Sequence, residues 1–403
     1  MINNNVSELS ARFIRRIINF MISISLSMVL VSFLLSLPLC GLVMHWAHRS
    51  GKLDTPGSES HKQHTAAIPN LGGVGIFWAI MLPLLGALLA SHLIPDTFWQ
   101  GLEGVAGGLE PLQRHMPGLR RQSLMLLGII GGLSCMHVLG LVDDRLRLAA
   151  IPKLAIQLLI ATLLVVGCDI RVFQMLDVYG MTGYLASVSV TVLWLGLIIN
   201  AMNMLDNMDG LAAGVGCIIA GIYLVVTLMG GQWFIASLAA LLMGAQLGFL
   251  WYNVSPARMF MGDGGSLVIG LMLGIISIRT TYFDPGGTFG SGGEVAWYGL
   301  LMPAVVMAVP LYDFFSVTIV RFLLGRKIMG GDRNHFSHRL VRKGLSVRAA
   351  VLVIWLCTLA TGLAGCMLPR LQAWQAVMVA MQTICVLVLL AVLEFSNSQK
   401  PVE

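Results

Sequence analysis

The sequence predicts an all-α, polytopic integral membrane protein with about 11 transmembrane helices. Two observations carry this prediction. Hydrophobic residues make up 57% of the 403 residues and charged residues only 11%, well below the roughly 25% of an average globular protein. Apolar runs of about 20 residues, long enough to cross the hydrocarbon core of a bilayer, recur along the whole chain.

Eleven apolar runs can be placed in order, separated by short polar segments. They lie at 20–46, 71–94, 123–142, 152–168, 185–202, 211–229, 233–252, 265–280, 297–324, 349–368 and 374–395. The ninth run is long and carries Pro310 near its middle, which predicts a tilted or kinked span. We expect one membrane-embedded domain over residues 1–403, with an N-terminal tail at 1–19 and a C-terminal tail at 396–403.

The basic residues distinguish the two sides of the membrane. With eleven spans, one side carries 16 of the 25 Lys and Arg residues, and the positive-inside rule assigns that side to the cytoplasm. Arg12, Arg15 and Arg16 in the N-terminal tail fall on the other side and oppose this orientation. The net charge of +6 follows from these loops, and no basic run interleaved with aromatic residues indicates nucleic-acid binding.

Two adjacent carboxylates, Asp143 and Asp144, end the third apolar run on the basic side. The macrodipole disfavours negative charge at the C-terminus of a helix. One interpretation is a solvated loop that Arg145 and Arg147 neutralise. Because the local field opposes both carboxylates, a metal site or a general base is the favoured interpretation.

A second polar cluster separates the fifth and sixth runs. It comprises Asn200, Asn203, Asp206, Asn207 and Asp209. Steps of three residues turn by about 60° around a helix, so these side chains converge only if one end unwinds, and Gly210 offers that. Helix capping would explain one or two of the five. Polar groups at the mouth of two spans are costly unless they bind something, which predicts a metal ion and a phosphorylated ligand.

The segment Phe260–Leu267 precedes the eighth run and contains Asp263. The simplest interpretation of Asp263 is a helix N-cap. Three neighbouring glycines add a second interpretation, because they let backbone N–H groups approach a phosphate at a positive helix end. A carboxylate beside a bound phosphate implies a divalent cation, and Mg²⁺ prefers a few carboxylates with phosphate oxygens and water.

Two further basic segments carry groups that suit phosphates. In the loop after the ninth run these groups are Arg333, His335, His338 and Arg339, a set that fits a diphosphate. An ordinary positive-inside loop would explain their charge but not the two histidines. Before the second run, Lys62 and His64 could hold a phosphate, although a simple turn explains that segment equally well.

Taken along the chain, the five polar clusters resemble those of the polyprenyl-phosphate N-acetylhexosamine-1-phosphate transferase family (glycosyltransferase family 4). The resemblance covers about residues 53–345. It rests on the Asp143-Asp144 pair, the N-x-x-N-x-x-D-x-x-D-G-L stretch from Asn200, and the F-M-G-D-x-G-S stretch from Phe260. It implies transfer of a sugar-1-phosphate, foremost GlcNAc-1-phosphate, from a UDP-sugar to undecaprenyl phosphate with release of UMP. That reaction would initiate a cell-envelope glycan such as lipopolysaccharide.

The resemblance also implies roles for single residues. Asp143 and Asp144 would be catalytic, and Asp263 with Asn203 would hold Mg²⁺, with Mn²⁺ as the alternative. The substrate-binding set would be Lys62, His64, Asn203, Asp206, Asp209, Arg333, His335, His338 and Arg339. Ser337 departs from the family pattern because it stands at the middle histidine of a His-x-His-His motif. This departure points to a subfamily outside the muramoyl-pentapeptide enzymes.

Several alternatives stay open at this level. The donor could be another UDP-N-acetylhexosamine or UDP-MurNAc-pentapeptide, and the transfer could be direct or pass through a covalent aspartyl-phosphate. A transporter of anionic metabolites is a remote alternative, since transport sites lie near the membrane midplane and often between repeats. A member of the family without activity is a third alternative.

The expected partners are a UDP-sugar, undecaprenyl phosphate and membrane lipid, with a homodimer left open. The expected location is the bacterial inner membrane, with the active site facing the cytoplasm.

Overall fold

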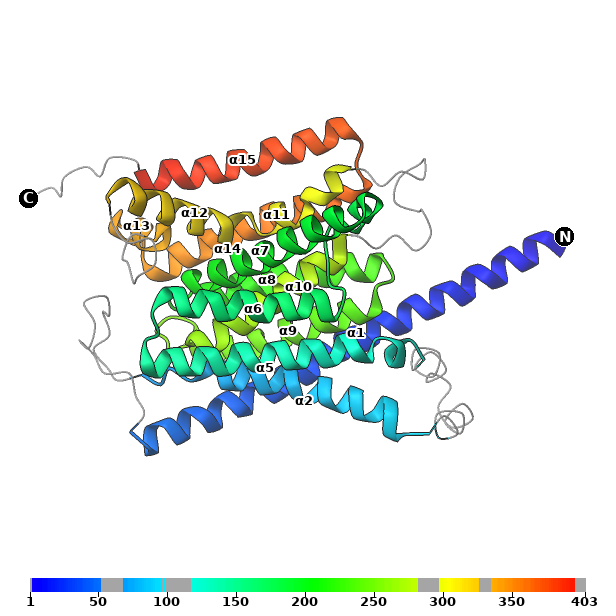
Figure 1. The fold of residues 1–403 in the computed structure, drawn as a ribbon, viewed down its shortest axis with the longest axis horizontal. Coiled ribbons are helices and arrows are strands. Elements are labelled where there is room, and N and C mark those ends of the chain that lie inside the picture. Colours follow the sequence, from blue (N-terminus) through cyan, green and yellow to red (C-terminus); the bar gives the residue numbers. More distant parts are fainter. Residues whose placement is uncertain are drawn as a thin grey trace, which may run out of the picture.

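The computed structural model describes residues 2–51, 68–95, 98, 117–281, 297–325 and 335–395. Long helices lie side by side in one bundle, and the described chain starts at one end of it and stops, at Phe395, at the other end (Figure 1). The described ranges contain no β-strand, so the predicted all-α class is confirmed.

The first half of the bundle consists of six long helices. They are α1 (Ile2–Arg49), α2 (Gly72–Leu93), α5 (Ser123–Leu146), α6 (Ala150–Gly167), α7 (Met181–Leu205) and α8 (Leu211–Met229). Residues 2–19, which the sequence suggests as a tail, continue α1 without a break, and the apolar part of α1 begins at Ile22.

The second half contains both long and short helices. They are α9 (Trp233–Asn253), α10 (Asp263–Thr281), α11 (Met302–Val306), α12 (Ala308–Leu323), α13 (Phe336–Arg342), α14 (Val347–Met367) and α15 (Ala373–Phe395). Short 3-10 turns occur at Gln174–Tyr179, Trp297–Leu301 and Leu368–Arg370.

Ten helices of the described residues are long and apolar enough to cross a membrane, and the number is eleven if one bent pair is counted as a single span. The pair consists of α11 and α12, which meet at 67°. Pro310 causes the break, because a proline ring collides with the carbonyl four residues earlier, here Val306, where α11 ends. The structure therefore confirms both the number of spans and the kink in the ninth.

Helix α10 forms the centre of the bundle. It is apolar on all sides and almost completely buried, packed against α2, α5, α7, α8 and α9. In contrast, α1 and α15 lie at the periphery and expose most of their apolar surface (Figure 1). The N-terminus of the central helix reaches the end of the bundle where α5 and α7 end and α6 begins.

Glycines let the chain pack closely around the start of α10. A Cβ on Gly73 would lie 2.2 Å from the backbone nitrogen of Gly265, and one on Gly140 would lie 2.4 Å from the backbone of Asp263. The backbone N–H groups of Gly72 and Gly73 also donate hydrogen bonds to the carbonyls of Phe260 and Met261, at 2.9 and 2.8 Å. The 68–73 segment, which alone suggests only a turn, thus holds the 260–265 segment in place.

Candidate active site

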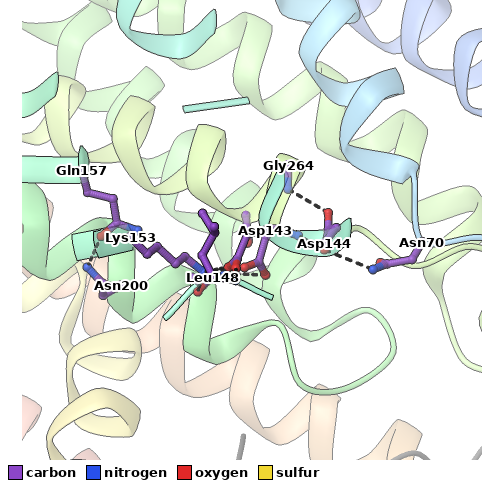
Figure 2. Close-up of polar contacts among 11 residues, drawn as sticks. Asn70, Asp143, Asp144, Leu148, Lys153, Gln157, Asn200 and Gly264 are labelled. Atoms are coloured by element: carbon purple, nitrogen blue, oxygen red, sulfur yellow. Dashed lines mark hydrogen bonds and ion pairs between the residues drawn. The ribbon is translucent and has the colours of Figure 1, made fainter. Parts of the chain in front are cut away.

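A lysine ammonium lies at the centre of the polar groups at this end of the bundle. Lys153, the fourth residue of α6, contacts Asp143 Oδ2 at 2.6 Å and Asn203 Oδ1 at 3.1 Å, and it forms an ion pair with Asp263 Oδ2. Asn203 Nδ2 donates to Asp263 Oδ1 at 2.8 Å and to Ser266 Oγ at 2.8 Å. Four helices, α5, α6, α7 and α10, are therefore joined at one point, part of which Figure 2 shows.

The two adjacent aspartates face different partners. Asp144 accepts hydrogen bonds from the backbone N–H groups of Asp263 at 3.0 Å and Gly264 at 3.3 Å, and from Asn70 Nδ2 at 3.2 Å (Figure 2). Asp143 instead accepts from Lys153 and from the backbone N–H of Leu148 at 2.7 Å. Successive residues on a helix point about 100° apart, which explains the divergence. Asp144 thus caps α10, and only Asp143 lies in the lysine cluster.

The cap occupies the backbone groups that the glycines around Asp263 were expected to present to a phosphate. The N–H groups of Asp263 and Gly264 are the ones that a phosphate at the start of α10 would use. In the structure they donate to the Asp144 carboxylate, so a side chain already supplies the negative charge that this helix end favours.

The loop between α7 and α8 brings a further carboxylate to the cluster. Gly210 has a φ of 75° and lies between the end of α7 and the start of α8, so the chain unwinds where the sequence predicts. Asp209 Oδ2 accepts the backbone N–H of Ala257 at 3.0 Å and so holds a neighbouring loop. The backbone N–H of Asp206 donates to the carbonyl of Asn203 at 3.3 Å, whereas its carboxylate makes no hydrogen bond with any residue that the structure describes. Its burial, and then the charges of Asp263, Asp144 and Asp209, raise the pKa of Asp206 to about 8.

Asn200 lies outside the cluster although it belongs to the same stretch of sequence. Its Nδ2 donates to Gln157 Oε1 at 2.8 Å and to the carbonyl of Gly196, which joins α6 to α7 one turn away from Asn203 (Figure 2). Asn200 therefore connects α6 to α7 and takes no part in the cluster around Lys153.

Buried acidic side chains fix the basic segment that follows α12. His335 Nδ1 pairs with Asp313 Oδ2 at 2.9 Å, and Arg339 forms a buried ion pair with Glu394 at 3.0 Å. His338 is half-buried and its ring lies 6.5 Å from that of His335. The predicted residues Lys62, His64 and Arg333 lie outside the described residues.

The residue types at the cluster fit a divalent cation. Carboxylate oxygens of Asp143 and Asp263 and the amide oxygen of Asn203 converge on one positive charge, and they are the hard donors that Mg²⁺ prefers. Lys153 is the only cation in direct contact with these groups within the described ranges. In that part of the chain, no three His, Cys, Asp or Glu residues form a ligand set on their own. The remaining ligands would be substrate phosphates and water, as is usual for Mg²⁺.

Comparison with known proteins identifies the family. The sequence profile of glycosyl transferase family 4 matches residues 126–281, the part that contains Asp143, Lys153, Asn203 and Asp263. A probable undecaprenyl-phosphate N-acetylglucosaminyl 1-phosphate transferase of Bacillus subtilis is 30% identical over 369 residues, which are 91% of this chain and 88% of that protein. The chain belongs to glycosyl transferase family 4. It is therefore a multi-pass membrane transferase, and the transporter alternative loses its basis.

Two further relatives have names that specify different transferred groups. A decaprenyl-phosphate N-acetylglucosaminephosphotransferase of Mycolicibacterium smegmatis is 36% identical over 286 residues, 66% of this chain and 70% of that protein. A phospho-N-acetylmuramoyl-pentapeptide-transferase of Granulibacter bethesdensis is 27% identical over 332 residues, 73% of this chain and 86% of that protein.

Several residues that contact the candidate site cannot be singled out from the sequence alone, with the exception of Lys153. A lysine inside an apolar span needs a partner, and this signal singles out Lys153 in the fourth apolar run. Asn70, Asp313 and Glu394 were missed. No local pattern reveals them, because each contacts a residue between 22 and 74 positions away.

Replacement of Lys153 tests whether the cluster is a cation site. In the presence of a chelator, Lys153→Met should lower the thermal midpoint, because Asp143 and Asp263 then face each other without the ammonium. Mg²⁺ or Mn²⁺ should raise the midpoint of this variant more than that of the wild type. Saturation at a hundred times the dissociation constant contributes about 2.7 kcal/mol.

Arg145→Met is the matched control for charge, since Arg145 is exposed on the last turn of α5 and takes no part in the cluster. Its response to added cation should equal that of the wild type. An equal response of the Lys153 variant and the wild type would contradict the assignment.

The raised pKa of Asp206 predicts a pH-dependent stability. Between the ordinary value of 3.8 and about 8, the folded state binds more protons than the unfolded state, so stability falls as pH rises through this window. In the presence of a chelator, the thermal midpoint should decline from pH 6 to pH 8 in the wild type and decline less in Asp206→Asn.

Asp177→Asn is the control for this pH experiment. Asp177 lies at the other end of the bundle, where its hydrogen bond to Arg171 lowers the pKa of Asp177 below its usual range. The control should therefore keep the wild-type slope over pH 6–8. A wild-type slope in the Asp206 variant would contradict the raised pKa.

Proposed function

We propose that this protein transfers GlcNAc-1-phosphate from UDP-GlcNAc to undecaprenyl phosphate and releases UMP, as the first step of a cell-envelope glycan. The observation that carries the proposal is the convergence of Asp143, Asp263 and Asn203 on one cationic position. The names of the relatives from Bacillus subtilis and Mycolicibacterium smegmatis supply the sugar and the class of lipid acceptor.

The reaction needs positioning and charge neutralisation more than it needs a strong base. An oxygen of the lipid phosphate attacks the sugar-linked phosphorus, a new P–O bond forms, and the bond to UMP breaks. A phosphate monoester has a second pKa of about 6 and is largely dianionic near neutral pH. Two like-charged substrates must therefore be brought together, which favours a site with cationic groups at its centre.

The chain's own residues divide these tasks. Lys153 offers an ammonium to the phosphates, and Asp143 lies beside it to accept any proton that the lipid phosphate still carries. Asp263 and Asn203 would hold Mg²⁺ together with Asp143, and the bound ion would neutralise the charge that develops on the UMP leaving group. Asp206 has its carboxylate available for a ligand, whereas Asp144 positions the start of α10.

The same proposal places the protein in the bacterial inner membrane with the site facing the cytoplasm. The excess of basic residues in the loops on the site's side of the membrane supports this orientation. UDP-sugars are soluble and highly charged, so they reach the site from an aqueous compartment, whereas the lipid acceptor reaches it from the bilayer.

The purified protein should release UMP when supplied with UDP-GlcNAc, undecaprenyl phosphate and Mg²⁺. UDP-GalNAc and UDP-MurNAc-pentapeptide serve as competing donors in the same assay, because relatives in the family include enzymes for the pentapeptide donor. A lipid-linked product should form fastest from UDP-GlcNAc. No product from any of these donors would contradict the proposed function.

Variants of the same protein connect this activity to the cluster. Asp263→Asn should lower kcat by about 10²–10³-fold, as expected for a lost electrostatic contact, while the protein stays folded. Asn203→Ala should lower it by about 10–100-fold, because this amide orients Asp263. Asn200→Ala is the matched control, since it removes an amide one turn earlier on α7 and should leave kcat nearly unchanged.

A further inference from the structure

The short helix α13 carries His338 and has His335 as its N-cap residue, and contacts from three separate parts of the chain fix its position. Asp313 of α12 is completely buried. It pairs with His335 Nδ1 at 2.9 Å and accepts the backbone N–H of Phe336 at 3.3 Å. These contacts cap the start of α13 and occupy one ring nitrogen of His335, so only Nε2 is left for a ligand.

The second attachment is a buried ion pair between α13 and the last helix of the chain. Arg339 is 7% exposed and Glu394, near the end of α15, is 3% exposed. Arg339 Nε donates to Glu394 Oε2 at 3.1 Å, and Nη2 contacts the same oxygen at 3.0 Å. Tyr312 donates to the other carboxylate oxygen at 2.7 Å, and Ser316 accepts from Arg339 Nη2 at 3.1 Å.

The third attachment links α13 to the loop that carries Asp206. Ser337 is completely buried, and its hydroxyl donates to Asn207 Oδ1 at 2.6 Å. Ser337 is the residue that replaces the middle histidine of the family pattern. Its small side chain fits between α13 and the loop and joins them directly.

These contacts distinguish Arg339 from the two histidines that are predicted to bind a ligand in this segment. An arginine that binds a diphosphate presents its planar fork of N–H groups to the phosphate oxygens. The Nε and Nη2 of Arg339 are instead turned inward, to Glu394 and Ser316, and the side chain is buried. His338 is half-buried and is a better candidate for contact with a ligand.

On the basis of the proposed function, we propose that Arg339 and Glu394 are positioning residues. Their ion pair ties α13 to α15 and so holds His335 and His338 where they meet the diphosphate of the nucleotide sugar. The last helix, which lies at the edge of the bundle, thereby contributes to the nucleotide side of the site (Figure 1).

The first experiment measures hydrogen exchange and needs no substrate. Glu394→Gln weakens the ion pair and should speed amide exchange across residues 335–342 by about tenfold, with α8 and α9 unchanged. Unchanged exchange in 335–342 would overturn the role of Glu394, and this result is independent of whether the protein turns over UDP-GlcNAc.

The second experiment separates a positioning arginine from a phosphate ligand. Arg339→Met and Glu394→Leu should each raise the KM for UDP-GlcNAc by about tenfold with little change in kcat, because binding is lost equally in the ground and transition states. The double variant should recover a KM within about threefold of the wild type, since two apolar side chains can replace a buried ion pair.

Arg342→Met is the matched control, because Arg342 is an exposed arginine on the same short helix and its loss removes the same charge. Its KM should match that of the wild type. A double variant as impaired as Arg339→Met would show that the arginine itself binds the diphosphate and would overturn the proposal. Wild-type protein without activity on any UDP-sugar would refute the proposed function instead, and the exchange experiment would still decide the role of the ion pair.

Discussion

The ion-pair cluster around Lys153 is the interaction on which the arrangement of the site depends. Four carboxylates, Asp143, Asp144, Asp206 and Asp263, lie close together at the end of a bundle of apolar helices. Such a concentration of negative charge is unfavourable away from bulk water unless cations or N–H groups oppose it. Lys153 and the start of α10 supply this opposition, and they join α5, α6, α7 and α10 at one point.

The bundle holds the cluster in place through its central helix. Because α10 is buried on all sides, its N-terminus has a fixed position, and Gly73 and Gly140 let α2 and α5 approach it closely. The Asp144 carboxylate then caps α10, which also orients the neighbouring Asp143 toward Lys153. Two adjacent aspartates that look equivalent in the sequence thus have different roles. Asp144 stabilises the start of α10, and Asp143 lies next to Lys153 at the proposed site of reaction.

The sequence predicts much of the fold because membrane spans are encoded locally. Length and hydropathy identify the spans, Pro310 identifies the bend, and Gly210 identifies the unwound loop, since each feature depends only on neighbouring residues. The partners of the charged groups depend on distant contacts and were not predicted. Glu394 lies 55 positions from Arg339 and Lys153 lies 110 positions from Asp263, so no periodicity or motif joins them. The charge of Arg339 suggested a substrate ligand, whereas its buried partner now suggests a positioning role.

A structure with bound Mn²⁺ and UDP-GlcNAc tests the central claim most directly, because anomalous scattering locates the metal without assumptions. One metal ion should lie about 2 Å from an Asp263 oxygen, with Asn203 or Asp143 as a further ligand and the Lys153 ammonium moved toward the phosphates. A metal ion bound elsewhere, with Lys153 still paired to both Asp143 and Asp263, would contradict this claim.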